Sequence, residues 1–152
     1  MATAPGPRVL SIRQPWAWAI AIGRKKVENR TWNTPYRGVV FIHASSNKDI
    51  KAVAWIRRHF GLAVPDGLPR CAVVAVAELT RKGGKRFGAW FEGPYGFVLK
   101  NVRPLRKPVR TLGKLGLFHA SPALRRSVEQ QVKPATRDCR SDMLVTLFHE
   151  TY

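Results

Sequence analysis

Short apolar runs separated by turn residues dominate the chain. Six of these runs are rich in β-branched or alternating hydrophobic residues, which is typical of strands: residues 8–13, 26–31, 37–44, 71–79, 95–103 and 143–149. The run over 71–79 is apolar at almost every position, which indicates a buried strand.

Three other stretches follow a helical period. The first begins at Pro15, whose missing N–H has no partner to lose in a first turn, and ends before Gly23. The second covers about residues 48–60, with Ser46 or Asn47 as the expected cap, and the third covers 122–132. Residues 61–70 and 104–116, rich in Pro, Gly or charge, are predicted to be loops.

The element order has no long linker, no break in composition and no internal repeat. About six strands and three helices in 152 residues therefore predict a single α+β domain over residues 8–152. Pro5, Gly6 and Pro7 mark residues 1–7 as a flexible leader.

Charge adds a functional expectation. The chain has 27 Lys and Arg against 9 Asp and Glu, a formal net charge of +18. Such a field attracts polyanions, so RNA or single-stranded DNA is the favoured partner. Binding to an anionic membrane and non-specific adhesion are the alternatives, and an acidic protein partner is a third reading.

The cysteines and histidines point to no metal site and no cofactor. Cys71 and Cys139 form neither a C-x-x-C pair nor a disulfide framework, and the histidines lack a metal-ligand spacing. The longest strongly apolar run, residues 16–22, is too short to span a membrane. We therefore expect a cytoplasmic protein with free thiols and no membrane partner.

One motif stands out between the first helix and the second strand. Gly23, Lys25, Glu28 and Arg30 fit the pattern G-x-K-x-x-E-x-R. Other segments with the same resemblance are residues 10–17, 36–38, 42–45, 95–99, 103–105 and 115–118. Over residues 9–118 the chain resembles ASCH (activating-signal-cointegrator homology) domains.

That resemblance implies a PUA-like β-barrel of about six strands with two or three flanking helices and a cleft beside the first helix. It also implies functions linked to RNA: members bind nucleic acid, some bacterial members are acetylcytidine amidohydrolases, and ribonuclease activity has been proposed for others. The amidohydrolase pattern has a small hydroxyl residue at the position of Glu28, so this chain departs from it there.

Lys25 and Glu28 are the candidate catalytic residues. A partly desolvated lysine beside other cations has a lowered pKa and can act as a base or nucleophile, while the carboxylate can accept or shuttle a proton. Glu28 can equally be a structural partner of Arg13 or Arg30. The residues therefore leave open whether the cleft binds a nucleotide or a modified base, or acts as a hydrolase.

Several further residues are candidates for contacting a ligand in that cleft. Trp16 can wall a base pocket, and Gln14 can either read a base edge or bond the backbone at the helix entry. Trp55 is expected in the core. The full set of candidate substrate-binding residues is Arg13, Gln14, Trp16, Arg30, Trp32, Tyr36, His43 and Ser45.

A second cationic zone covers residues 81–114, where ten Lys and Arg face a single acid, Glu92. It is either a solvated charged face or a surface for phosphates, and the imbalance favours phosphates. The candidate nucleic-acid-binding residues are Arg81, Lys82, Lys85, Arg86, Arg103, Arg106, Lys107, Arg110 and Lys114.

Overall fold

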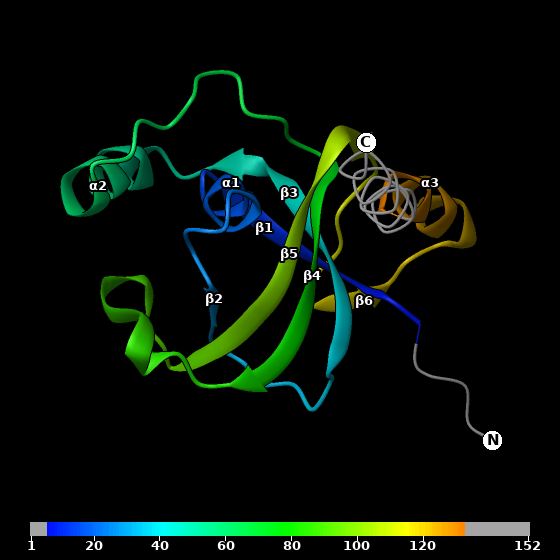
Figure 1. Ribbon diagram of the computed structural model, residues 1–152, viewed down its shortest axis with the longest axis horizontal. Coiled ribbons are helices and arrows are strands. Elements are labelled where there is room, and N and C mark those ends of the chain that lie inside the picture. Colours follow the sequence, from blue (N-terminus) through cyan, green and yellow to red (C-terminus); the bar gives the residue numbers. More distant parts are fainter. Residues whose placement is uncertain (1–5, 133–152) are drawn as a thin grey trace, which may run out of the picture.

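A computed structural model describes residues 6–132 of the chain, which form one mixed sheet with helices around it (Figure 1). The strands are β1 (Arg8–Gln14), β2 (Val27–Arg30), β3 (Gly38–Lys48), β4 (Ala72–Lys82), β5 (Tyr95–Arg110) and β6 (Leu117–His119). The helices are α1 (Trp16–Ala21), α2 (Ile50–Phe60), the 3₁₀ segment η1 (Lys85–Trp90) and α3 (Pro122–Val132).

The sheet has the order β2-β5-β4-β3-β1-β6. β1 runs parallel to β3, and the other pairs are antiparallel. The α+β class is confirmed, but the expected closed barrel is not: among residues 6–132 the sheet stays open, with β2 and β6 at its edges. Arg30, on the edge strand β2, instead donates a hydrogen bond from its guanidinium to the carbonyl oxygen of Ser11 on β1 at 2.8 Å.

Both faces of the sheet are covered by apolar side chains. Leu10, Ile42 and Phe97 belong to the cluster that packs against α1, while Phe41 and Val73 belong to the cluster beneath α3. β4 pairs on both sides and is buried from Ala72 to Ala77, as its apolar run predicts. The central strands therefore form a firm base for the elements beside α1.

A third apolar cluster joins α1, α2 and η1, and it holds Ala19, Val27, Ile56 and Trp90. α2 begins two residues later than expected because β3 continues to Lys48, and its cap is Asp49, which accepts a hydrogen bond from the Ala52 amide at 3.2 Å. Thus Asp49, rather than Ser46 or Asn47, starts the helix at the edge of this cluster.

The largest departure from the predicted elements is in β5, which continues through residues 104–110 where a loop was expected. β2 pairs with β5 only up to Val98, so the later part of β5 has a free side on which Pro104 and Pro108 are tolerated. Gln131 of α3 covers this side, because its amide accepts from the Lys107 N–H at 3.0 Å and donates to the Lys107 carbonyl at 2.9 Å.

Three smaller differences complete the comparison. β6 and η1 were not predicted, because both are too short to produce a periodic pattern. The predicted strand over 143–149 lies outside the described residues. Pro7, the last residue of the predicted leader, is buried, and its carbonyl oxygen accepts from the Ala120 N–H.

Candidate functional site

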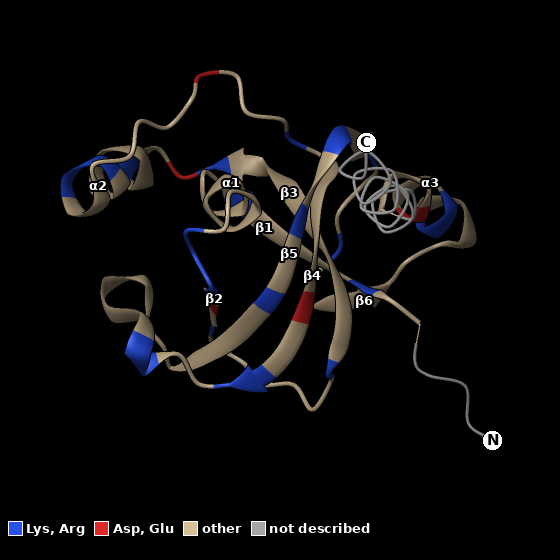
Figure 2. Cartoon of the chain, in the orientation of Figure 1, with Lys and Arg blue, Asp and Glu red and all other residues tan. Residues whose placement is uncertain are grey.

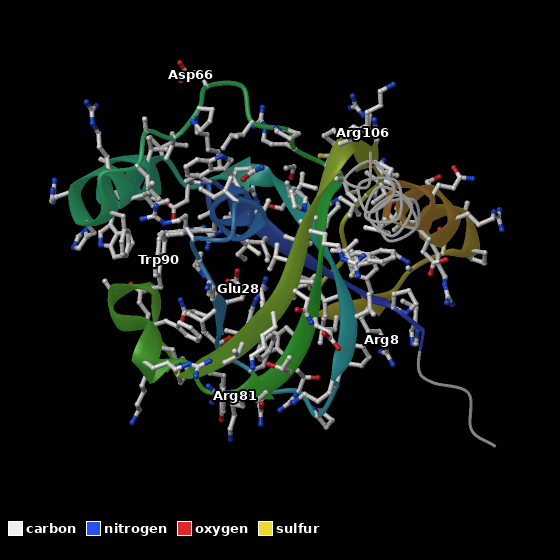
Figure 3. The ribbon with its side chains drawn as sticks, in the orientation of Figure 1. Arg8, Glu28, Asp66, Arg81, Trp90 and Arg106 are labelled. Carbon is white, nitrogen blue, oxygen red and sulfur yellow. The ribbon has the colours of Figure 1, made fainter. Side chains whose placement is uncertain are left out.

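A cavity of about 490 Å³ opens beside α1, between the motif strand β2 and the two elements α2 and η1. Three indole rings line it: Trp16 of α1, Trp55 of α2 and Trp90 of η1. Figure 3 shows Trp90 between α2 and η1, with Glu28 on the neighbouring β2. We call this space the tryptophan cavity.

The three rings meet edge to face. Their centroids are 5.6 Å apart for Trp16 and Trp55, 6.4 Å for Trp16 and Trp90, and 6.0 Å for Trp55 and Trp90. Phe60 stacks on Trp90 at 3.8 Å from outside the cavity, which supports the ring from behind. Such contacts fix aromatic rings in place, so the cavity has rigid, flat walls.

The candidate pair Lys25 and Glu28 lies in this cavity. The Lys25 ammonium is 3.7 Å from Oε2 of Glu28 and donates a hydrogen bond to the Val27 carbonyl oxygen. Only 3% of the Lys25 surface is exposed. Burial lowers the pKa of Lys25, and the nearby Glu28 carboxylate opposes this shift.

Two polar atoms of the motif are buried without a partner among the described residues. They are Oε2 of Glu28, which is beyond hydrogen-bond distance of Lys25, and Nε of Arg30. Both residues line the tryptophan cavity. Buried polar groups normally find partners, so an unpaired acceptor and an unpaired donor beside one cavity are typical of a ligand site.

Asn29, between these two residues, holds the wall that carries Trp90. Its Nδ2 donates to the Trp90 carbonyl oxygen at 2.9 Å, and its Oδ1 accepts from the Glu92 and Gly93 amides at 2.9 and 3.2 Å. One side chain thus ties β2 to the segment between η1 and β5. This role could not be predicted from the sequence, because no local pattern links residue 29 to residues 90–93.

Other cavity residues were also missed. Asp49 accepts from Nε1 of Trp16 at 3.2 Å, which links the cap of α2 to the cavity wall. Trp55, expected in the core, lines the cavity with Glu92 and Lys51. The only sequence feature that could have indicated Asp49 and Trp55 is their spacing, since a residue able to cap a helix is followed six residues later by a tryptophan.

Of the candidate substrate-binding residues, Arg13, Trp16 and Arg30 line the cavity, and the other five do not. Gln14 is 1% exposed, and both ends of its amide bond the backbone, at Pro69 and Trp18. The alternative of a backbone hydrogen bond at the helix entry therefore describes Gln14, and the base-reading alternative does not.

The remaining four make contacts elsewhere. Trp32 packs edge-on against Phe97, and the Tyr36 hydroxyl donates to the carbonyl oxygen of Val39. The Ser45 hydroxyl lies 3.4 Å from the Asn47 carbonyl oxygen. His43 is buried and does not line the tryptophan cavity.

His43 has both ring nitrogens engaged. Nε2 must carry the proton, because it faces the Thr111 carbonyl oxygen at 2.8 Å, so Nδ1 accepts from the Ser11 hydroxyl at 2.7 Å. Gly113 lies against the pair so closely that a Cβ there would contact the Ser11 hydroxyl. Burial lowers the pKa of His43, which favours the neutral ring.

The nine candidate nucleic-acid-binding residues are all exposed. They do not form one compact patch, because they follow the β4–β5 hairpin from end to end (Figure 2). Arg81 and Arg106, labelled in Figure 3, lie at opposite ends. Within residues 6–132 the only ion pairs are Lys25–Glu28 and Arg125–Glu129, so no carboxylate in that range neutralises these nine cations.

Two further findings concern the described residues as a whole. No helix among them is long and apolar enough to cross a lipid bilayer. No group of three His, Cys, Asp or Glu side chains in residues 6–132 is placed to hold a metal ion. Cys71 is a free thiol, and Cys139 lies outside the described residues.

An open α+β sheet with a cavity between its motif strand and flanking helices defines the class of domain, and comparisons with known proteins define the family. The ASCH domain model matches residues 10–107, so the chain belongs to the ASCH domain family. The fold agrees with the crystal structure of ASCH from Zymomonas mobilis at 16% identity and a TM-score of 0.52, covering 82% of this chain and 94% of that one. A mutant form of the same Zymomonas protein also gives a TM-score of 0.52.

Curated relatives are larger proteins. The chain is 30% identical to human activating signal cointegrator 1 over 111 residues, which cover 63% of this chain and 19% of that protein. It is 46% identical to the mouse protein of the same name over 77 residues, covering 46% of this chain and 13% of the relative. The chain thus spans less than a fifth of the length of these relatives.

Proposed function

We propose that this ASCH domain binds single-stranded nucleic acid, RNA in the first place, and receives one base in the tryptophan cavity. The observation that carries the proposal is the combination of three indole walls with a carboxylate and a guanidinium, those of Glu28 and Arg30, in the lining of one cavity. Its volume of about 490 Å³ lies in the usual range for small-ligand sites.

The polar groups of the cavity suit the edge of a base. The carboxylate of Glu28 can accept a hydrogen bond from an exocyclic amine, which cytosine, adenine and guanine each carry. The guanidinium of Arg30 can donate to a ring nitrogen or a carbonyl oxygen of the same base. The indole rings supply stacking surface that accepts any base.

The exposed cations of the β4–β5 hairpin supply the affinity for the backbone. Each phosphate that they neutralise releases counterions, so the dissociation constant is expected to rise steeply between about 50 and about 200 mM salt. Fluorescence anisotropy with a short labelled single-stranded RNA measures this slope. A dissociation constant independent of salt would contradict phosphate binding.

The variant Trp55→Leu separates the contribution of base stacking to the affinity from that of electrostatic attraction to the phosphates. Stacking is worth about 1–3 kcal/mol per base, so the variant should bind the same RNA about 5- to 150-fold more weakly with an unchanged salt slope. Trp32→Leu is the matched control, because Trp32 packs on Phe97 outside the cavity. Equal affinities of Trp55→Leu and wild type would refute a base in the cavity, and single-stranded DNA of the same sequence tests the preference for RNA.

Hydrolysis of a modified nucleoside or of RNA is the second candidate, favoured by the lowered pKa of the buried Lys25 beside Glu28. Lys25 would act as base or nucleophile, and Glu28 would move the proton. Mass spectrometry of nucleosides, with gel analysis of RNA, should then show turnover that both Lys25→Ala and Glu28→Gln abolish. Activity that survives both substitutions would exclude this site as its source.

A further inference from the structure

A second cavity, of about 390 Å³, lies on the other side of the segment that bears Trp90. It is formed by the end of β4, the loop to η1 and the start of β5, at the lower end of the hairpin in Figure 1. Four cationic side chains line it, those of Arg81, Lys82, Lys85 and Arg86, and no Asp or Glu does. We call it the basic pocket.

None of these four cations forms an ion pair within residues 6–132. Glu92, the one acid between residues 81 and 114, lines the tryptophan cavity instead. The tryptophan cavity therefore has mixed charge, whereas the basic pocket has only positive charge. Like charges repel, and a bound anion would relieve the repulsion among these four cations.

Aromatic rings hold two of the cations. The Lys82 ammonium lies 5.9 Å from the centre of the Tyr95 ring, and the Arg86 guanidinium lies 4.8 Å from that of Phe87. These contacts limit the positions that the two long side chains adopt without neutralising their charge. The cations are thus partly ordered before any ligand arrives.

The floor of the pocket is backbone packed closely on backbone. The Gly83 amide donates to the Gly96 carbonyl oxygen at 2.9 Å, and a Cβ on Gly96 would overlap the Gly83 carbonyl oxygen. Phe91 packs against Gly84 and Gly96, where an added Cβ would lie 3.0 and 2.7 Å from its ring. The absence of side chains at residues 84 and 96 lets the loop lie flat on β5, which keeps the concavity open and fixed in shape.

We infer that the basic pocket binds a phosphate group, and specifically a phosphomonoester such as the one at the end of a nucleic-acid strand. A monoester carries between one and two negative charges at neutral pH, whereas a phosphate inside the strand carries one, so four converging cations favour the monoester. The inference extends the proposed function, which requires only phosphates along the hairpin. The phosphate group could also come from a free mononucleotide or from pyrophosphate, which have the same chemistry as the strand end.

The test compares three RNAs of identical sequence that carry a 5′-phosphate, a 3′-phosphate or hydroxyls at both ends. Wild-type protein should bind either the 5′-phosphorylated or the 3′-phosphorylated RNA about tenfold more tightly than the RNA with hydroxyls at both ends. The reason is that hydrogen bonds to charged groups are stronger than those between neutral groups. The triple variant Arg81→Gln, Lys85→Gln, Arg86→Gln should lose this difference. Pyrophosphate and a nucleoside monophosphate are titrated by calorimetry at constant ionic strength.

A control variant with the same change in net charge is available away from the pocket. Arg57, Arg58 and Arg126 are exposed and lie on α2 and α3, and none forms an ion pair in the described range. Replacing all three by Gln should weaken binding of every RNA equally and keep the preference for the terminal phosphate. Thermal melting of both triple variants verifies that each is folded.

The outcomes separate this inference from the proposed function. Equal affinity of wild type for phosphorylated and hydroxyl RNAs, with no binding of pyrophosphate or the nucleoside monophosphate, would overturn the phosphate pocket and leave nucleic-acid binding intact. A preference that the pocket variant retains would also overturn it. Binding of pyrophosphate that only the pocket variant loses, without binding of any RNA, would support the pocket and refute the proposed function.

Discussion

Replacing Glu28 by Gln should destabilise the domain because it leaves a buried ammonium without its counter-charge. The Lys25 side chain is 3% exposed and that of Glu28 is 10% exposed, with 3.7 Å between the charged atoms. At that separation, and with the effective dielectric constant of about 20 that suits protein sites, the attraction is about 4 kcal/mol. Its loss is comparable to the stability of a small domain, which starts at about 5 kcal/mol.

The net loss is smaller than the attraction itself, because Lys25 keeps its hydrogen bond to the Val27 carbonyl oxygen and can release its proton. Breaking one side of a buried pair costs about 3 kcal/mol at the lower end of measured values, and we expect that loss for Glu28→Gln near neutral pH. The double variant Lys25→Met, Glu28→Gln should recover most of it, because neither charge then remains buried.

The loss should also depend on pH with a definite sign. A lysine whose folded pKa lies below the unfolded value of 10.5 weakens the fold while it is charged, and this penalty diminishes as pH rises from the folded pKa towards 10.5. Without Glu28 the pKa of Lys25 falls further. The destabilisation by Glu28→Gln should therefore diminish as pH rises from neutral.

Urea denaturation of wild type and the variants at several pH values measures these differences. Glu129→Gln is the control, because it breaks the exposed pair with Arg125, in which 52% and 32% of the two side chains are accessible. That pair should contribute less than about 1 kcal/mol. If Glu28→Gln unfolds at the same urea concentration as wild type across the pH range, the charges are not coupled as described.

Two further predictions concern the sheet. Val74→Asp places a carboxylate on the central strand at an 8% exposed position and should cost about 5 kcal/mol or more, whereas Val39→Asp, at a 43% exposed position, should melt near the wild-type temperature. For His43, whose folded pKa is lowered, the free energy of unfolding should be constant above the unfolded pKa of about 6.5 and decrease below it, and His43→Asn should flatten that profile in urea titrations.

The sequence predicted most elements because hydrophobic periodicity controls their formation. The buried run of β4 and the stripe of α2 lie where the pattern places them. The second half of β5 was missed because Pro104 and Pro108 are normally signs of a loop. They are compatible with a strand here only because the neighbouring side of β5 is free and is covered by Gln131, a tertiary contact that local patterns do not contain.

The candidate site was predicted in part for the same reason. Lys25, Glu28 and Arg30 are close in sequence, so one motif places them together. Trp55 and Trp90 reach the cavity from α2 and η1, and their contribution depends on how those elements pack. For Gln14 the sequence left two alternatives open, because it does not show that the Pro69 carbonyl oxygen lies opposite the Gln14 amide.

Trp90 and Phe91 are consecutive residues, yet Trp90 lines the tryptophan cavity and Phe91 lines the basic pocket. The two sites therefore share one wall, which Asn29 anchors through Trp90, Glu92 and Gly93. A ligand that displaces the wall from one side changes the shape of the other site. By thermodynamic linkage, the resulting change in binding free energy is equal in both directions. Residues 83–96 thus form the segment through which cooperativity between a base and a phosphate would be transmitted.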